Sequence, residues 1–147
     1  MNLRILILGF AFTAFISTTF AHAAQLQQCG GYRTDVTSLV DLRSFANGNI
    51  KLVHYDTGGE PVCCSSHLAI VHPAPGSDAG VKCTLLTGPA SAPGFTDVEL
   101  KRVKGRYVAG KGLRLSIPVQ VYTGSSSVRR WHTLTINQKT GTVTLNK

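Results

Sequence analysis

The sequence contains no aspartate or glutamate after Glu99, so all seven of its acidic residues lie in the first 99 of 147 positions. It also lacks a Gly-x-Ser-x-Gly elbow, a glycine-rich phosphate loop and a dinucleotide fingerprint, which are typical of hydrolases, nucleotide-binding enzymes and dehydrogenases. After residue 23, no apolar run is long enough for a transmembrane helix. These absences favour a soluble, non-catalytic protein that uses no cofactor.

The N-terminus has the three parts of a secretory signal peptide. Arg4 supplies a positive charge, residues 5–20 are almost entirely apolar, and Ala21-His22-Ala23 places small residues at both positions that signal peptidase reads. We therefore predict a signal peptide over residues 1–23 and a periplasmic or secreted protein. The remaining residues, 24–147, have the length of one domain.

Alternation of apolar and polar residues predicts an all-β fold, a small antiparallel barrel or sandwich. The clearest strand covers residues 113–121, where Leu113, Leu115 and Ile117 face one way and Arg114 and Ser116 face the other. Pro118 favours a sheet edge or a bulge at this strand, because proline donates no ladder hydrogen bond. Further strands are predicted over residues 62–72, 81–86, 95–103, 106–109, 131–136 and 142–145.

Residues 34–46 predict one short N-terminal helix. Asp35 would be its N-cap, Leu39, Leu42 and Phe45 would share a face, and Asn47-Gly48 would end it. The same Asn-Gly pair is also typical of a two-residue hairpin turn leading into residues 50–55. We favour the helix and keep the hairpin as the alternative.

The four cysteines of the mature chain predict two disulfide bonds, as expected in an exported protein. A bond between the neighbours Cys63 and Cys64 departs from ordinary disulfide geometry, which leaves two pairings, each joining Cys29 and Cys83 to one of the neighbours. Cys64 and Cys83 each lie on the apolar face of a predicted strand, so we favour Cys64–Cys83 in the core and Cys29–Cys63 on the outer face. If residues 62–72 and 81–86 form a simple hairpin, however, Cys83 lies too far from Cys64. The alternative is then Cys29–Cys83, with Cys63 and Cys64 vicinally bonded or reduced.

Metal binding is an alternative use of this part of the chain. His54, Cys63, Cys64, His67 and His72 gather in the sequence, and Cu(I) or Zn accepts such ligands. No paired Cys-x-x-Cys spacing accompanies them, so we favour disulfide-bonded cysteines with incidental histidines.

Two weak catalytic patterns are also present. Asp56-Thr57-Gly58 matches the aspartic-protease triplet, but no later apolar-apolar-Gly support follows, so we interpret it as a tight turn. Ser65, Ser66, His67 and His132 include a nucleophile and a base, but no elbow motif presents the serines. We predict that the protein is not an enzyme.

The segment Lys104-Gly105-Arg106-Tyr107, followed by Gly110-Lys111-Gly112, resembles the Ser-Gly-x-Tyr loop of the membrane-bound/periplasmic C-type lysozyme inhibitors. The resemblance is confined to this segment, and Lys104 stands where that family has serine. It implies a small disulfide-linked barrel that inserts this loop into the cleft of a hydrolase. Lysozymes are usually basic, so the charge here fits an acidic target instead.

The charge of the mature chain points to an anionic partner. Ten of its 14 basic residues follow Glu99, and a field of this kind attracts anions. Outside the cytoplasm the common anions are lipid headgroups, acidic glycans and acidic proteins, rather than nucleic acids. The sequence therefore predicts an anionic surface or an acidic protein as partner, and it sets no oligomeric state. The predicted binding residues are Lys101, Arg102, Lys104, Arg106, Tyr107, Arg129, Arg130 and Trp131.

Overall fold

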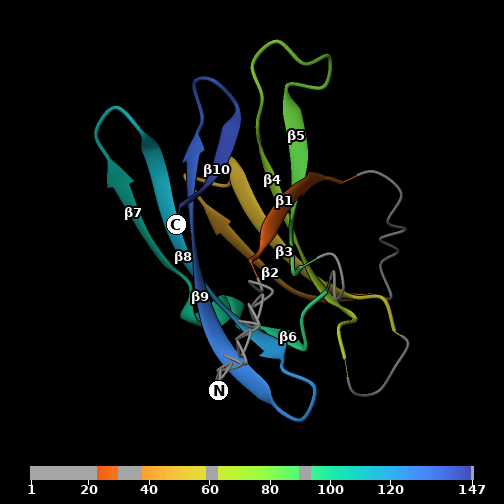
Figure 1. Cartoon of the computed structure of the whole chain (residues 1–147). Coiled ribbons are helices and arrows are strands. Elements are labelled where there is room, and N and C mark those ends of the chain that lie inside the picture. The colour runs from red at the N-terminus through yellow and green to blue at the C-terminus, as the bar shows by residue number, and fades with distance from the viewer. Residues whose placement is uncertain (1–22, 30–37, 59–62, 90–93, 147) are drawn as a thin grey trace, which may run out of the picture.

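The chain folds into two antiparallel β-sheets that face each other across an apolar core (Figure 1). The computed structural model describes residues 23–29, 38–58, 63–89 and 94–146. The first sheet, in the order β1-β5-β4-β3-β2, consists of β1 (Gln25–Gln28), β2 (Leu39–Phe45), β3 (Ile50–Asp56), β4 (Ser66–Pro73) and β5 (Val81–Thr87). The all-β, sandwich-like architecture predicted from the sequence is confirmed.

The second sheet is built around its longest strands, β8 and β9. It consists of β6 (Asp97–Val98), β7 (Lys104–Val108), β8 (Gly112–Tyr122), β9 (Ser127–Asn137) and β10 (Thr142–Asn146), in the order β10-β9-β8-β6. β7 also pairs with β8, next to β6, and a single 3₁₀ turn, η1 (Leu100–Arg102), lies between β6 and β7. Two short segments thus share one edge of β8.

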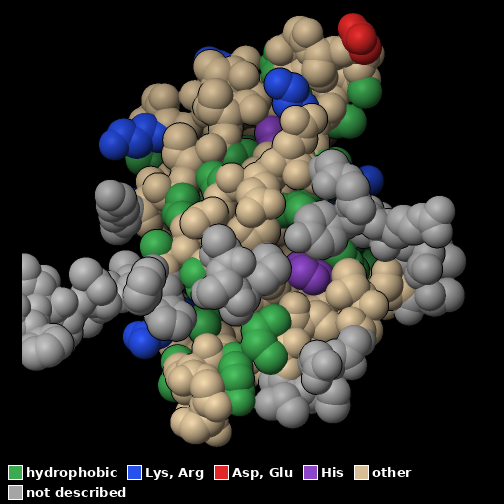
Figure 2. Space-filling model, turned by 45° about the vertical axis from the view of Figure 1, so that its right-hand side comes forward, with side chains coloured by type: hydrophobic (Ala, Val, Ile, Leu, Met, Phe, Trp, Pro, Cys, Tyr) green, Lys and Arg blue, Asp and Glu red, His purple; other side chains and the backbone are tan. Residues whose placement is uncertain are grey.

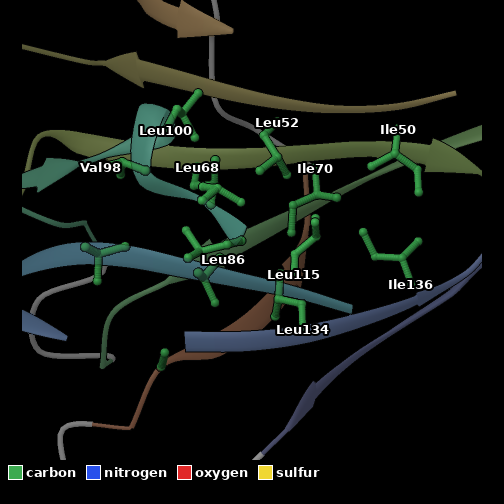
Figure 3. Packing of buried hydrophobic residues seen from close by; sticks show 14 of the residues in the cluster. Ile50, Leu52, Leu68, Ile70, Leu86, Val98, Leu100, Leu115, Leu134 and Ile136 are labelled. Carbon is green, nitrogen blue, oxygen red and sulfur yellow. The ribbon is translucent and has the colours of Figure 1, made fainter. Parts of the chain in front are cut away.

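The alternation predicted for β8 places its apolar residues in the core. Leu113, Leu115, Ile117 and Val119 are buried, whereas Arg114 and Ser116 are only partly buried. The core side chains interleave between the sheets, with Leu52, Ile70 and Leu86 of the first sheet facing Leu115 and Leu134 of the second (Figure 3). The polar residues of β8 are left on the outer face of the second sheet.

The predicted helix is wrong over residues 39–46, and the hairpin alternative is correct. β2 and β3 form an antiparallel pair joined by Ala46-Asn47-Gly48-Asn49, and Ala46, Asn47 and Gly48 all have positive φ. The apolar spacing misled the prediction because Leu39 and Leu42 are about half exposed and mark no buried face. The remainder of the predicted helix, residues 34–37, lies outside the described residues.

The predicted strand over residues 95–103 is largely interrupted. Only Asp97 and Val98 pair with β8, and the chain then turns through η1 before β7 begins. Pro118 of β8 lies beside this interruption, where its carbonyl accepts a hydrogen bond from the Glu99 N–H (3.1 Å). Pro118 is therefore in a central strand, not at a sheet edge. Its backbone nitrogen, which carries no hydrogen to donate, faces the gap between β6 and β7.

The preferred disulfide pairing is wrong, and the alternative is correct. The bonds are Cys29–Cys83, with 5.3 Å between the Cα atoms, and the vicinal bond Cys63–Cys64. β4 and β5 form a simple hairpin in which Cys83 is opposite Val71, so Cys64, which precedes β4, is out of reach. Cys29 is within reach because β1, which the sequence did not predict, pairs with β5.

Disulfide bonds indicate an oxidising, non-cytoplasmic compartment. The predicted signal peptide itself lies almost entirely in residues 1–22, outside the described residues. Within the described ranges, no helix is long and apolar enough to cross a membrane.

Replacing Cys29 and Cys83 together by alanine is expected to lower the free energy of unfolding by about 4 kcal/mol, because their bond joins residues 54 positions apart. The double replacement Cys63→Ala/Cys64→Ala is expected to cost far less, since a bond between neighbours closes almost no loop. Urea unfolding measures both losses. Equal losses, or a peptide mass map that joins Cys64 to Cys83, would contradict the assigned pairing.

Candidate functional site

Three cationic side chains meet on the outer face of the second sheet. Strand pairing places Arg106 of β7 directly opposite Arg114 of β8, and Lys104 opposite Ser116. On the other side of β8, Ser116 is opposite Thr133 of β9. These residues line a pocket of about 380 Å³, which we call the cationic pocket: Lys104, Gly105, Arg106, Arg114, Ser116 and Thr133.

The opposed arginines are an unfavourable arrangement for the fold alone. Like charges directly opposite each other on one face of an antiparallel pair are destabilising. Within the described residues, no carboxylate forms an ion pair with Lys104, Arg106 or Arg114, and the pocket lining contains none. Every strand that builds this face, apart from the short β6, follows Glu99, after which the sequence has no acidic residue. The positive charges of these three side chains are therefore unpaired among the described residues.

Two hydroxyl groups complete the pocket. Ser116 and Thr133 are partly buried, and in the described part of the chain their side chains form no hydrogen bond with another residue. Each hydroxyl can both donate and accept a hydrogen bond. The pocket thus combines three positive charges with two neutral donors, a set suited to an anion that carries oxygen atoms.

Gly105 explains how Lys104 and Arg106 both face outward. Between them on β7, Gly105 faces the core, where an added Cβ would lie 3.1 Å from side-chain atoms of Leu115 and of Phe45 in β2. A larger residue here would require the side chains of Leu115 and Phe45 to shift. The absence of a side chain lets β7 lie close over the core while its cations point to solvent.

Trp131 of β9 adjoins the cationic pocket. It shares the outer face with Thr133, is opposite Pro118, and is 45 % exposed. The Lys104 ammonium lies 5.7 Å from the centre of its ring, within the range of a cation–π contact. Trp131 and Lys104 therefore form one continuous surface with the pocket.

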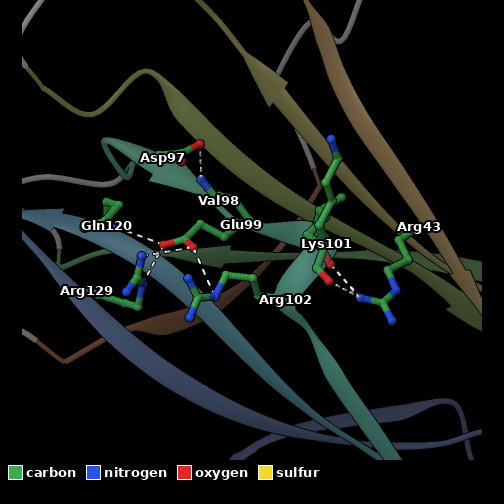
Figure 4. Close-up of polar contacts among 9 residues, drawn as sticks. Arg43, Asp97, Val98, Glu99, Lys101, Arg102, Gln120 and Arg129 are labelled. Carbon is green, nitrogen blue, oxygen red and sulfur yellow. Dashed lines mark hydrogen bonds and ion pairs between the residues drawn. The ribbon is translucent and has the colours of Figure 1, made fainter.

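Two of the other predicted cations pair with Glu99. The Glu99 carboxylate accepts hydrogen bonds from Arg129 (2.6 and 3.1 Å) and Gln120 (2.9 Å), and it lies 3.5 Å from Arg102 (Figure 4). These contacts, that of Arg129 above all, hold the pKa of Glu99 below its usual range. Arg102 and Arg129 thus belong to an ion-pair network beside β6, away from the cationic pocket.

The three remaining predicted residues are not in the pocket. Lys101 is in η1, where its carbonyl and that of Leu100 accept hydrogen bonds from the Arg43 guanidinium (3.2 and 2.8 Å; Figure 4). Arg130 and Tyr107 each point to the opposite face of their strand from their neighbours Trp131 and Arg106. The Tyr107 hydroxyl accepts a hydrogen bond from Gln138 (3.2 Å).

The structure adds Arg114 to the site, a residue missing from the predicted set. The sequence could have indicated this residue, because the alternation of β8 placed Arg114 and Ser116 on the polar side of the strand. Only the register, which puts Arg114 opposite Arg106, brings it to the other cations. The segment Lys104–Tyr107, which resembles an inhibitory loop, instead forms most of β7 and is paired along its length with β8.

The proposed metal ligands are spread over both faces of the first sheet. His72 points to the core side, where it contacts the Thr84 hydroxyl (3.0 Å), and His67 points to the outer side, where it stacks on Tyr55 (5.3 Å). Burial lowers the pKa of both His54 and His67. Among the residues that the structure describes, no three His, Cys, Asp or Glu side chains gather closely enough to hold a metal ion.

The two catalytic patterns have structural roles in the described residues. The Gly58 N–H donates to the Asp56 carboxylate (2.9 Å), so the Asp-Thr-Gly triplet forms an Asx turn at the end of β3. The Ser66 hydroxyl donates to the Thr96 carbonyl (3.4 Å) rather than to a histidine.

The strands of the first sheet contain few basic residues: Arg43, Lys51 and Lys82. Figure 2 turns the β1 and β5 side of the molecule forward and shows scattered Lys and Arg side chains among hydrophobic and uncharged groups. The cationic pocket is therefore a local feature of the second sheet.

Comparison with known proteins identifies no relative: no protein family, no curated protein and no solved structure matches this chain.

Replacing Arg129 by alanine is expected to raise the pKa of the Glu99 carboxyl toward its usual range, because Arg129 is the main group that lowers it. The matched control is Arg130→Ala, which removes a cation from the other face of β9 and should leave this pKa unchanged. NMR titration of the side-chain carboxyl carbon measures both. An unchanged pKa in Arg129→Ala would rule out the network as drawn.

Proposed function

We propose that this is an exported protein, periplasmic or secreted, that binds an anionic ligand through the cationic pocket and does not catalyse a reaction. The observation that carries the proposal is the pair Arg106 and Arg114, placed directly opposite each other with Lys104 beside them. Two opposed arginines weaken the pairing of β7 with β8, and a role in ligand binding explains why they are present.

The chemistry of the pocket supports an oxygen-bearing anion. Guanidinium groups donate two parallel hydrogen bonds to a carboxylate, phosphate or sulfate, and charged hydrogen bonds are stronger than neutral ones. Lys104 adds a third charge, and Ser116 and Thr133 can satisfy further oxygen atoms. The wider field of the chain after Glu99 would draw such ligands toward this face.

We expect the mature protein to bind inorganic tripolyphosphate, with an affinity that falls as salt is added. In Arg106→Ala/Arg114→Ala the affinity is expected to fall by about tenfold or more, since charged hydrogen bonds contribute about 1.5–3 kcal/mol each. Isothermal titration calorimetry at low and high salt measures this.

The matched control is Lys51→Ala/Lys82→Ala, which removes the same charge from exposed positions on the first sheet. It should retain most of the affinity. A wild-type protein that does not bind, or a control that loses as much affinity as the pocket variant, would overturn the proposed function.

A further inference from the structure

We infer that the ligand of this face is an anionic glycan, with one sugar ring stacked on Trp131 and an acidic group in the cationic pocket. This inference rests on the proposed function and specifies its ligand class. It starts from Trp131, the only tryptophan of the chain, which is nearly half exposed and adjoins the cationic pocket through Lys104. An exposed indole is a large apolar surface, and the flat C–H face of a sugar ring is a ligand that covers it.

The groups along this face extend over a length that suits a ligand of more than one sugar ring. Trp131 is opposite Pro118, Ser116 is opposite Thr133, and Arg114 comes last, four residues from Pro118 along β8. At the rise of a β-strand, this distance is about 13 Å. The face therefore presents a stacking surface with Lys104 beside it, then hydroxyl donors, then the two arginines, over more than the width of a single sugar ring.

The same face continues as a neutral, hydrogen-bonding surface. Asn146 of β10 donates to the Thr135 hydroxyl (3.0 Å) and to the Thr133 carbonyl (3.2 Å), and Thr144 is opposite Thr135. No carboxylate occurs in the sequence of β7, β8, β9 or β10. A polyhydroxylated anion thus finds hydrogen-bonding groups on these strands, and the carboxylate that borders the face, Glu99, is paired with Arg129 and Arg102.

The distribution of exposed apolar side chains argues against a lipid surface as the ligand. Among the described residues, the other large exposed hydrophobic side chains are Leu39, Val40 and Leu42 of β2, Val81 of β5 and Tyr107. The first four lie on the first sheet, and Tyr107 points away from the outer face of β7. Trp131 alone does not provide the apolar area that holds a protein on a bilayer.

The test compares four probes: a sulfated tetrasaccharide, an oligogalacturonate of the same length, inorganic tripolyphosphate and phosphatidylglycerol vesicles. We expect at least one of the acidic saccharides to bind and to change the fluorescence of Trp131, whose signal is unambiguous because it is the only indole. Trp131→Ala should weaken saccharide binding by up to about tenfold and leave tripolyphosphate binding unchanged. Trp131→Phe, which keeps an aromatic ring, should retain most of the saccharide affinity.

The remaining outcomes distinguish failure of the glycan inference from failure of the anion-binding function. If tripolyphosphate binds but neither saccharide does, or if Trp131→Ala weakens both ligands equally, the glycan inference is wrong and the anion-binding function stands. Binding of phosphatidylglycerol vesicles in preference to both saccharides would likewise replace the glycan by a lipid surface. If none of the anions binds, the proposed function itself fails.

Discussion

The alternation of β8 is the constraint on which the rest of this structure depends. Its apolar side fills the core between the sheets, and its pairing with β9, β7 and β6 sets the position of every strand in the second sheet. Because side chains alternate, burial of Leu113, Leu115 and Ile117 forces Arg114 and Ser116 to the outer face. The core and the cationic pocket are thus two sides of the same strand.

This arrangement also explains how the fold tolerates an unfavourable charge cluster. The opposed arginines lie at the β7–β8 pairing, whereas most of the stability comes from the apolar core and the Cys29–Cys83 bond. Glu99, in contrast, pairs with Arg129 and Arg102 beside β6. Cations that pair with a carboxylate and cations that do not are therefore in separate parts of one sheet.

The sequence was sufficient for the features that depend on local pattern and insufficient for those that depend on register. Alternation of apolar and polar residues predicted β8 and an all-β barrel or sandwich. A strand that buries one face has this pattern, and strands of this kind pack into such folds. The helix over residues 34–46 was predicted from apolar spacing, yet β2 is an edge strand whose apolar residues are partly exposed, so pairing with β3 decided its structure.

The disulfides and the site illustrate the same limit. Cys29 reaches Cys83 only because the short polar strand β1, which has no alternation signal, pairs with β5. Likewise, charge density and neighbouring aromatic residues grouped eight residues as a site, whereas the structure brings Lys104 and Arg106 together with Arg114 and places Arg102 and Arg129 with Glu99. Which cations share a surface depends on which residues lie opposite each other across the strands.

The central claim is that Arg106 and Arg114 are opposed for binding and at a cost to folding. Its most direct test is the free energy of unfolding of Arg106→Thr without ligand, at low and at high salt, compared with Lys51→Thr, whose strand neighbours Ser44 and Val71 are uncharged. We expect Arg106→Thr to be more stable than the control by about 0.2–1 kcal/mol at low salt, with the gain disappearing at high salt. A loss of stability at low salt would mean that Arg106 supports the fold, and would contradict the account.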